Sequence, residues 1–227
     1  MHFIFMLTKD DATVGNAMAA YEEVRDTALR YVGFKDIGAP IETLMAITAL
    51  AHEDGREVML EVVSTTEEAE ARSLRAGLEI GVDWVLGGTR VDLGTRIFAG
   101  TGVRYCPFPG RIIGHPSVLD GDVADIVADA RRKAATEGVH GLDLLAYRHP
   151  SVDPILLTRE VVQAVDVPVI VAGSIDSHER IALVETTGAW GFTIGGAIFD
   201  SLLPGGPDLA PQIAGVLDVL SPRAAQP

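Results

Sequence analysis

The chain has 227 residues, of which 48% are hydrophobic and 22% charged, and its 18 basic against 32 acidic residues give a formal net charge of −14. This balance excludes a disordered, collagen-like or coiled-coil protein, and it argues against nucleic acids and membranes as partners, because anionic surfaces are bound by clustered Lys and Arg. The one cysteine, Cys106, excludes an internal disulfide framework and indicates a reducing, cytoplasmic location.

Short apolar or β-branched runs alternate with longer segments of helical periodicity along the chain. In chain order, the eight predicted strands are Phe3–Leu7, Tyr31–Phe34, Val58–Val63, Asp83–Leu86, Val103–Cys106, Leu142–Tyr147, Val167–Val171 and Gly191–Ile194. Most of the segments between them repeat apolar residues at i, i+3, i+4 and i+7, as amphipathic helices do. Nearly continuous apolar strands that alternate with helices predict a parallel sheet covered on both faces.

Eight such units in a chain of this length predict a (β/α)8 TIM barrel, an α/β fold, as a single domain over residues 1–220 with a C-terminal tail at 221–227. A doubly wound open sheet is the main competitor, and the lack of a glycine-rich loop after the first strand makes it the weaker interpretation. The longest connection, Pro107–Gly121, follows the fifth strand. A long loop at the catalytic mouth of a barrel is typical of a binding or lid element.

The last two strands both end in small residues, Gly173-Ser174 and Gly195-Gly196. Glycine lets backbone N–H groups approach a phosphate closely, and the start of the following helix adds a partial positive charge. A lone pair of glycines indicates only a tight turn, but two such motifs 22 residues apart predict that these four residues bind a phosphate.

These strands resemble those of the phosphate-binding TIM barrels. That group includes the histidine- and tryptophan-biosynthesis isomerases, the hexulose-phosphate and ketogulonate-phosphate lyases, thiamine phosphate synthase and N-acetylmannosamine-phosphate epimerase. The specific match covers residues 167–199, and Gly195–Ile198 is especially similar to the epimerase pattern. The resemblance implies a phosphorylated small substrate anchored at the two glycine motifs, but it does not choose a reaction. The Asp-x-Lys-x-x-Asp pattern of the ketogulonate-phosphate lyases is absent, because the third strand reads Leu60–Ser64 as Leu-Glu-Val-Val-Ser.

The reacting groups must come from the ends of the other strands, where barrel active sites are built. Lys35 follows a buried strand, where desolvation lowers the pKa of an amine and makes it an imine nucleophile or a cation that stabilises an enolate. Glu61 lies within an apolar strand, which is costly unless its carboxylate points into the barrel mouth. A structural ion pair of Lys35 with Glu61 or Asp36 is the alternative.

Two further pairs of residues have both a functional and a structural interpretation. Asp10 is a candidate general base, whereas Asp11 is more simply explained as the cap of the first helix. Arg90 and Arg148 each follow a strand, where a guanidinium can bind a phosphate or carboxylate with two hydrogen bonds. A surface salt bridge is the alternative for both arginines.

The remaining candidates concern proton transfer and metals. Of the six histidines, only His115 in the long loop and His149 after the sixth strand are placed for proton transfer. The chain has no His-x-His, His-Glu-x-x-His or Asp-x-Asp cluster, so we expect no metal site and no cofactor, with Mg²⁺ on Glu61 and Asp36 left open. Cys106 ends the fifth strand, where a buried apolar cysteine is the common outcome.

Basic residues at predicted strand ends, namely Lys9, Lys35, Arg90 and Arg148, predict a locally positive mouth on an acidic protein. A single phosphate needs only backbone N–H groups and one or two cations. The net charge of −14 therefore excludes an extended polyanion but not a small phosphorylated metabolite, which is the partner we expect.

Three functional hypotheses follow. The first is a C–C lyase of aldolase or decarboxylase type that acts on a small phosphorylated keto-sugar or keto-acid. In it, Lys35 stabilises an enolate or forms an imine, and Glu61 or Asp10 moves the proton. The second is a sugar-phosphate isomerase or epimerase that uses enediolate acid–base chemistry. The third is a non-catalytic barrel that binds a phosphorylated metabolite. The sequence leaves a homo-oligomer open.

Overall fold

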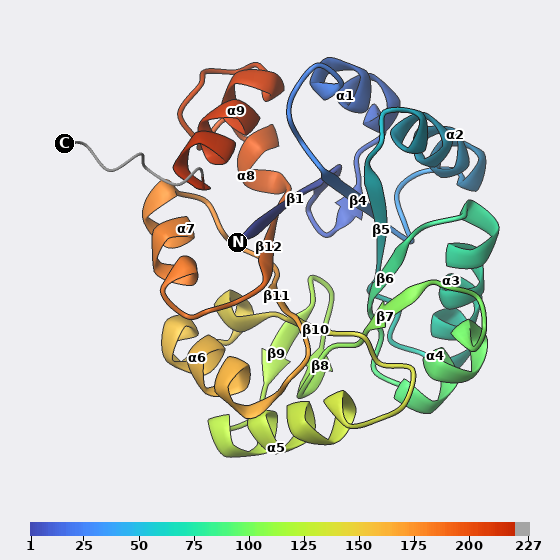
Figure 1. The fold of residues 1–227 in the computed structure, drawn as a ribbon, viewed down its shortest axis with the longest axis vertical. Helices are drawn as coiled ribbons and strands as arrows, with labels where there is room; N and C mark the ends of the chain where they lie inside the picture. Colours follow the sequence, from blue (N-terminus) through green and yellow to red (C-terminus); the bar gives the residue numbers. More distant parts are fainter. Residues whose placement is uncertain (221–227) are drawn as a thin grey trace.

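The computed structural model describes residues 1–220, so the predicted tail at 221–227 lies outside the described residues. The predicted TIM barrel is confirmed: eight parallel strands form one sheet in the order β10-β11-β12-β1-β4-β5-β6-β7. Two hydrogen bonds join its outer strands, from His140 N–H to the Tyr105 carbonyl (2.8 Å) and from Asp143 N–H to the Pro107 carbonyl (3.1 Å). The sheet therefore nearly closes on itself, with the helices around it (Figure 1).

Each predicted strand overlaps one strand of the barrel, so the open doubly wound sheet is excluded; the predicted strand Leu142–Tyr147 is too long, because residues 146–148 form a 3₁₀ helix. The barrel strands are β1 (His2–Met6), β4 (Tyr31–Lys35), β5 (Glu57–Val62), β6 (Trp84–Gly87), β7 (Arg104–Cys106), β10 (Leu142–Leu144), β11 (Val169–Val171) and β12 (Gly191–Ile194). The helices are α1 (Ala17–Val24), α2 (Ile41–Glu53), α3 (Glu67–Ile80), α4 (Val91–Phe98), α5 (Val123–Ala134), α6 (Pro154–Ala164), α7 (His178–Glu185), α8 (Gly196–Phe199) and α9 (Leu209–Leu220). A one-turn 3₁₀ helix, Ala146–Arg148, follows β10. Within residues 1–220, no helix combines the length and the apolar character of a membrane span.

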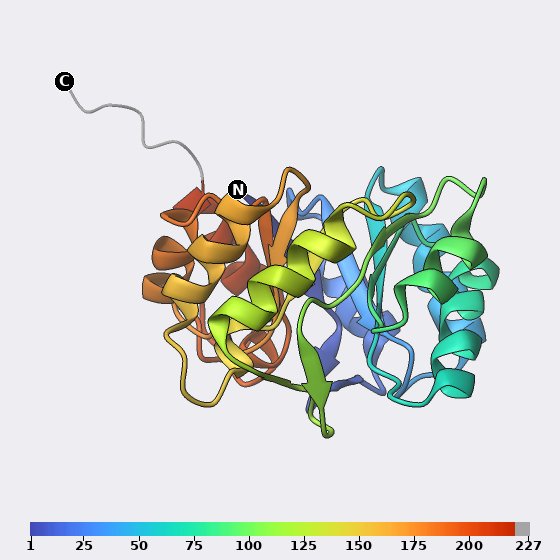
Figure 2. The same cartoon turned by 90° about the horizontal axis from the view of Figure 1, so that it is seen from below.

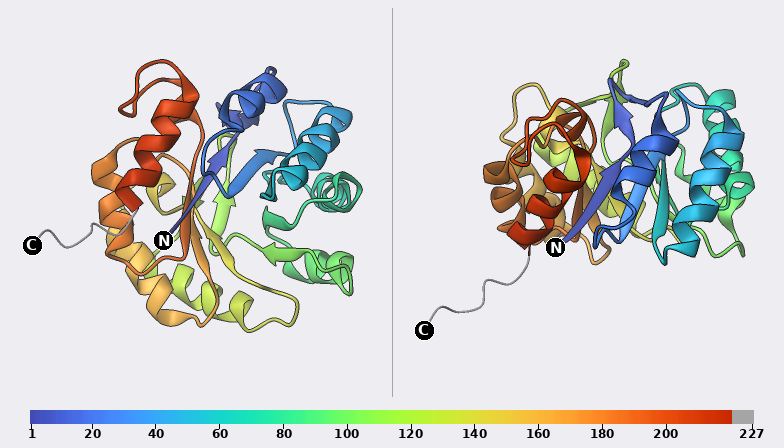
Figure 3. Two further views of the ribbon diagram at one scale, coloured as in Figure 1. Left: turned by 45° about the horizontal axis from the view of Figure 1, so that its top comes forward. Right: turned by 90° about the horizontal axis from the view of Figure 1, so that it is seen from above.

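Side-chain alternation along the strands divides the apolar residues into two cores. The larger core lies between the barrel and the helices, which stand outside the strands in both views of Figure 3. The smaller core fills the barrel interior and consists of Ile4, Met6, Tyr31, Met59, Trp84, Leu86, Cys106 and Ile170. Because Met59 points inward, Glu61 two residues later also points inward, as the alternation predicted.

Aromatic rings close the amino-terminal end of the barrel. The Trp190 ring lies 4.4 Å from the ring of His2, 5.5 Å from that of Tyr31 and 5.4 Å from that of Trp84, measured between centroids. Aromatic contacts of this kind stabilise a fold beyond the area they bury. A ligand must therefore enter at the other end, where the strands end.

Two short hairpins lie at the carboxyl end of the barrel. The first, β2 (Thr8–Lys9) and β3 (Ala12–Thr13), directly follows β1. The second, β8 (Arg111–Ile113) and β9 (Val118–Asp120), is formed by the long connection after β7. Figure 2 shows the second hairpin projecting beyond the strands at the end opposite to the N-terminus. The long loop is thus a structured element at the mouth.

Two helical glycines distinguish the effect of packing from that of helix propensity. An added Cβ at Gly94, in α4, would lie 2.3 Å from the buried ring of Tyr105, whereas at Gly215, in α9, the nearest atom would be 3.5 Å away. Since alanine favours a helix over glycine by about 1 kcal/mol, we expect Gly215→Ala to raise the free energy of unfolding by up to that amount. Gly94→Ala should lower it by about 2 kcal/mol, because the ring cannot move aside. Denaturant titration measures both, and a stabilising Gly94→Ala would contradict this packing.

Candidate active site

A cavity of about 500 Å³ opens at the carboxyl ends of the strands. Eight of the nine predicted site residues line it: Asp10, Lys35, Glu61, Arg148, Gly173, Ser174, Gly195 and Gly196. Pro116–Val118 of the second hairpin forms another part of the wall. The ninth residue, Arg90, does not line the cavity; Glu70 holds its guanidinium at 2.6 Å, so the structure shows the salt bridge that was its alternative.

Asp10 and Asp11 form the two-residue turn of the first hairpin, with φ of 50° and 62°. Positive φ at both central residues defines a type I′ turn, in which Asp is well tolerated. The turn leaves Asp10 exposed at the rim and buries Asp11 in the site. The interpretation of Asp11 as the cap of the first helix is therefore wrong, since α1 begins at Ala17 with Asn16 at its N-cap.

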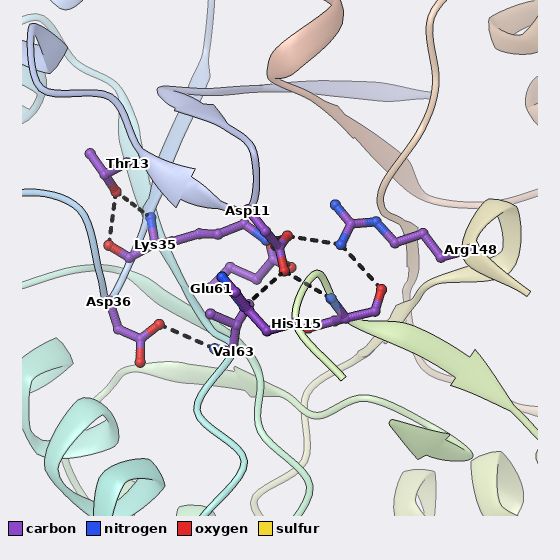
Figure 4. Close-up of polar contacts among 9 residues, drawn as sticks. Asp11, Thr13, Lys35, Asp36, Glu61, Val63, His115 and Arg148 are labelled. Atoms are coloured by element: carbon purple, nitrogen blue, oxygen red, sulfur yellow. Dashed lines mark hydrogen bonds and ion pairs between the residues drawn. The ribbon is translucent and has the colours of Figure 1, made fainter. Parts of the chain in front are cut away.

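The Asp11 carboxylate is the centre of a polar network (Figure 4). Oδ1 accepts hydrogen bonds from Nζ of Lys35 (2.5 Å) and Nη1 of Arg148 (2.8 Å), and Oδ2 accepts one from Ser117 N–H (3.0 Å). Nδ1 of His115 lies 3.6 Å from Oδ2. Burial would raise the pKa of Asp11, but the charges of Lys35 and Arg148 outweigh it and hold this pKa well below its usual range. Asp11 is thus an organising anion and a poor proton acceptor.

Lys35 ends β4 and is only 3% exposed. Its ammonium lies between Asp11 and Glu61, with Oε1 of Glu61 at 3.1 Å. The hydroxyl of Thr13 fixes the backbone, because it donates to the Lys35 carbonyl (2.9 Å) and accepts from the Lys35 N–H (2.8 Å). Burial would lower the pKa of Lys35, but the Glu61 and Asp11 carboxylates outweigh it and raise this pKa. The expected lowered pKa is therefore wrong.

Asp36 is not a partner of Lys35. Its Oδ1 accepts the Val63 N–H (3.1 Å) and its Oδ2 accepts the Ser64 hydroxyl (2.8 Å), so it points away from the Lys35–Glu61 pair (Figure 4). The two carboxylates left open for Mg²⁺ thus have separate partners. Within the described residues, no group of three or more His, Cys, Asp or Glu side chains could hold a metal ion.

Two of the glycines are required by packing. An added Cβ at Gly173, where φ is +79°, would lie 2.4 Å from Nε of Arg148, whose side chain passes over the end of β11. At Gly195 it would lie 2.5 Å from Oγ1 of Thr8, where β12 packs against the end of β1. Gly196 differs, because an added Cβ there meets no described atom within 4 Å. Packing therefore does not account for Gly196, which lines the cavity and begins α8.

The predicted positive mouth is not present. All four basic residues expected to create it have acidic partners: Lys9, Lys35, Arg90 and Arg148. The partner of Lys9 is Asp200, which follows α8 beside the glycine motif. A bound anion must therefore be held by N–H groups that these pairs leave free or must displace one of these carboxylates.

The two candidate histidines have different environments. Nε2 of His149 lies 2.8 Å from the Gly121 carbonyl, and its Nδ1 accepts from the N–H groups of Ser151 and Val152. Both ring nitrogens of His149 are thus bound to the backbone, and the side chain fixes the end of the long connection. His115 stays half-exposed at the tip of the second hairpin, near Asp11.

Sequence reasoning missed one acidic residue in the barrel interior. Asp143 is fully buried on β10, and its neighbours Leu142 and Leu144 belong to the outer core, so Asp143 points inward. Neither of its carboxyl oxygens has a hydrogen-bond partner within residues 1–220. Burial and then the charge of Glu61 raise the pKa of Asp143 well above its usual range. A single acid within an apolar strand, the signal that identified Glu61, could have found it.

No protein-family model and no curated protein sequence matches the chain. A solved structure of a cube-shaped, highly porous protein cage, designed by fusing symmetric oligomeric domains, aligns at a TM-score of 0.68 and 16% identity over 96% of this chain and 72% of that chain. A mutant of FabK from Thermotoga maritima aligns at a TM-score of 0.58 and 15% identity, over 87% of this chain and 62% of its own, so this chain spans less than two thirds of it. The chain is a TIM barrel. At these identities the similarity establishes the fold alone.

The neighbouring aspartates of the first hairpin provide a matched test of the network. Asp11→Asn removes a counter-charge from the buried Lys35 and the half-buried Arg148, so we expect it to lower the free energy of unfolding by about 3 kcal/mol. Asp10→Asn, on the exposed rim, should change it by less than about 0.5 kcal/mol. Because the pKa of Asp11 is lowered in the folded state, the difference between the variants should shrink as the pH falls below about 4. Denaturant titrations at several pH values measure this, and equal losses in both variants would contradict the network.

Proposed function

We propose that the cavity is the active site of a C–C lyase that acts on a small phosphorylated keto-sugar or keto-acid through an enolate. The observation that carries the proposal is the Lys35 ammonium, held between two carboxylates on the floor of a cavity that Gly196 also lines. This arrangement offers a buried cation for a developing oxyanion and an open glycine for a second anionic group.

The proposed reaction uses the positive charge of Lys35 and the two carboxylates that contact it, Asp11 and Glu61. When a C–C bond beside a carbonyl breaks, its electron pair passes to the enolate oxygen, which a preorganised cation in a dry site stabilises strongly. In aldol cleavage, Glu61 takes the proton of the substrate hydroxyl, the C–C bond breaks, and the same proton returns to the enolate carbon. Asp11 is held by three donors and positions Lys35. The exposed Asp10 has no step in this scheme, and neither has Arg90.

The protonation state of Lys35 favours a mechanism through an enolate over one through an imine on Lys35. An imine forms only when an uncharged amine attacks the carbonyl carbon. The carboxylates of Asp11 and Glu61 instead raise the pKa of Lys35 and keep its ammonium charged. The residue therefore acts through its charge.

The phosphate of the substrate is proposed to bind at Gly173, Ser174, Gly195 and Gly196, with Arg148 beside them. The first N–H groups of α8 have no acceptor within their own helix, which supports this placement. The resemblance to the phosphate-binding barrels over residues 167–199 supports it independently. We further propose a cytoplasmic location, and the similarity to a cage of symmetric oligomeric domains is consistent with a homo-oligomer.

An isomerase or epimerase is the second candidate. Such an enzyme removes a proton from the carbon beside the substrate carbonyl, which forms an enediolate, and then returns a proton to another carbon or to the other face. This chemistry is simplest with two carboxyl groups. The presence of two carboxylates in the cavity wall, Asp10 and Glu61, supports this candidate. Non-catalytic binding of a phosphorylated metabolite stays the third.

Gly196 offers a test of phosphate binding that leaves the fold intact. We expect a phosphorylated ketone such as dihydroxyacetone phosphate or ribulose 5-phosphate, at about ten times its Kd, to stabilise the protein by about 1.4 kcal/mol, measured as a thermal shift. Gly196→Leu should abolish the shift, because the new side chain enters the cavity. Gly15→Leu, also in open space but outside the cavity, should retain it. Lack of any shift, or a shift that survives Gly196→Leu, would count against phosphate binding here.

The role of Lys35 can be tested with the same ketone in deuterated water, where enolate formation exchanges carbon-bound hydrogen. Lys35→Ala should slow this exchange by about 100-fold to 1000-fold, and Lys35→Arg should retain part of it, because the arginine keeps the charge. Borohydride added with the ketone should leave Lys35 unmodified in a mass spectrum. A reduced adduct on Lys35, together with inactive Lys35→Arg, would instead support the imine.

A further inference from the structure

The guanidinium of Arg148, in the 3₁₀ helix after β10, is engaged on one side only. Its Nη1 donates to Oδ1 of Asp11 (2.8 Å) and to the Ser117 carbonyl (3.2 Å). In the described part of the chain, Nε and Nη2 have no acceptor, and neither atom is fully buried. They form the opposite edge of the planar group, which Figure 4 shows turned away from Asp11. Since Arg148 lines the cavity, this edge is open to a ligand.

The free edge of Arg148 lies at the proposed phosphate site. An added Cβ at Gly173 would be only 2.4 Å from Nε, so the arginine passes directly over the first glycine motif. Strand β11, which precedes Gly173, pairs with β12, which leads to Gly195 and Gly196. Two parallel N–H groups on one guanidinium edge match two oxygens of a phosphate. A phosphate at the glycine motifs can therefore bind Arg148 without displacing Asp11.

The other side of Arg148 holds the second hairpin over the cavity. The Ser117 carbonyl accepts from Arg148, and the Ser117 N–H donates to Oδ2 of Asp11 (3.0 Å), so the hairpin is attached to the same ion pair. The tip, residues 113–116, is exposed and projects beyond the strands (Figure 2). Both contacts of Ser117 must break if the hairpin opens. The same Asp11 also binds Lys35, so the hairpin, the phosphate site and the proposed reacting cation meet at one arginine–aspartate pair.

We propose that Arg148 couples phosphate binding to closure of the second hairpin, so that the phosphate of the substrate is required for reaction as well as for anchoring. The guanidinium is rigid, so a phosphate that fixes its free edge also fixes the direction of Nη1 toward Asp11 and Ser117. Phosphate and the closed hairpin then stabilise each other equally, because such coupling is reciprocal. Closure excludes water from Lys35 and strengthens its interaction with an enolate oxygen. The inference rests on the proposed function, since it assigns a second role to the phosphate of that substrate.

Inorganic phosphate alone tests the coupling by amide hydrogen exchange. The buried Ser117 N–H should exchange with solvent only when the hairpin opens. If the closed form alone binds phosphate, phosphate at about ten times its Kd should slow this exchange by about tenfold. The Leu156 N–H is the matched control: it also donates to an aspartate, Asp153 (2.7 Å), but lies at the exposed start of α6, outside the cavity. Its exchange rate should not change.

Two variants test whether Arg148 carries the effect. Arg148→Lys keeps the positive charge, but a single ammonium cannot bind phosphate and both partners of Nη1, so phosphate should no longer slow exchange at Ser117. Gly196→Leu leaves Arg148 in place and should remove the effect by blocking phosphate, a result that does not depend on Arg148→Lys folding. Gly15→Leu should retain the effect. If phosphate produces a thermal shift without slowing Ser117, or if Arg148→Lys responds as the wild type does, the inference is overturned.

The consequence for reaction is tested with dihydroxyacetone, a ketone without phosphate. Inorganic phosphate added separately should speed deuterium exchange into this ketone by at least about tenfold in the wild type and not in Arg148→Lys. If phosphate slows exchange at Ser117 but no ketone exchanges, with or without its own phosphate, the proposed function fails and the coupling stands. If dihydroxyacetone phosphate exchanges while bound phosphate leaves Ser117 unchanged, the inference alone fails. If phosphate does not bind, the coupling and the proposed phosphate site both fail.

Discussion

The burial of the Lys35 ammonium is the constraint on which the rest of the site depends. A cation that is 3% exposed loses several kcal/mol of hydration, and only carboxylates in close contact offset this loss. Glu61 is supplied by the neighbouring strand, in register with Lys35. Asp11 must come from outside the sheet, which requires the chain to turn back directly after β1. The positive φ values of that tight turn serve this purpose.

The Asp11 carboxylate then links connections that are distant in sequence. It accepts a hydrogen bond from Ser117 in the second hairpin and from Arg148 after β10, and Arg148 also donates to the Ser117 carbonyl at 3.2 Å. Loops at the mouth of a barrel are ordinarily its most mobile part. Here one buried anion holds three of them, so a ligand that displaces Arg148 from Asp11 also weakens the attachment of the hairpin over the cavity.

The sequence predicted the barrel, and it predicted Lys35, Glu61 and Arg148 as residues of the site, but not Asp11. Parallel strands buried on both faces produce local apolar runs, and alternation along such a run places Glu61 inside. Asp11 could not be found in this way, because its orientation depends on a turn and on partners up to 137 residues away. The raised pKa of Lys35 was missed for the same reason: the ion pair with Glu61 was foreseen as an alternative and is present, but the second carboxylate, Asp11, was not foreseen as its partner. Asp143 carries the same signal as Glu61, a single acid between apolar residues of a predicted strand, so the sequence contained enough to identify it.

The ion pairs at the mouth of the barrel determine how the acidic net charge affects ligand binding. Because the basic residues at the mouth have acidic partners, the protein offers no strong field to steer an anion from a distance. Capture of a phosphate would instead depend on contacts within a few ångströms, at Gly196 and the start of α8. Such contacts distinguish ligands by shape rather than by charge. If the proposed function holds, such a site would accept one small anion whose carbonyl reaches Lys35 and would exclude extended polyanions, so the same geometry would select for both binding and reaction.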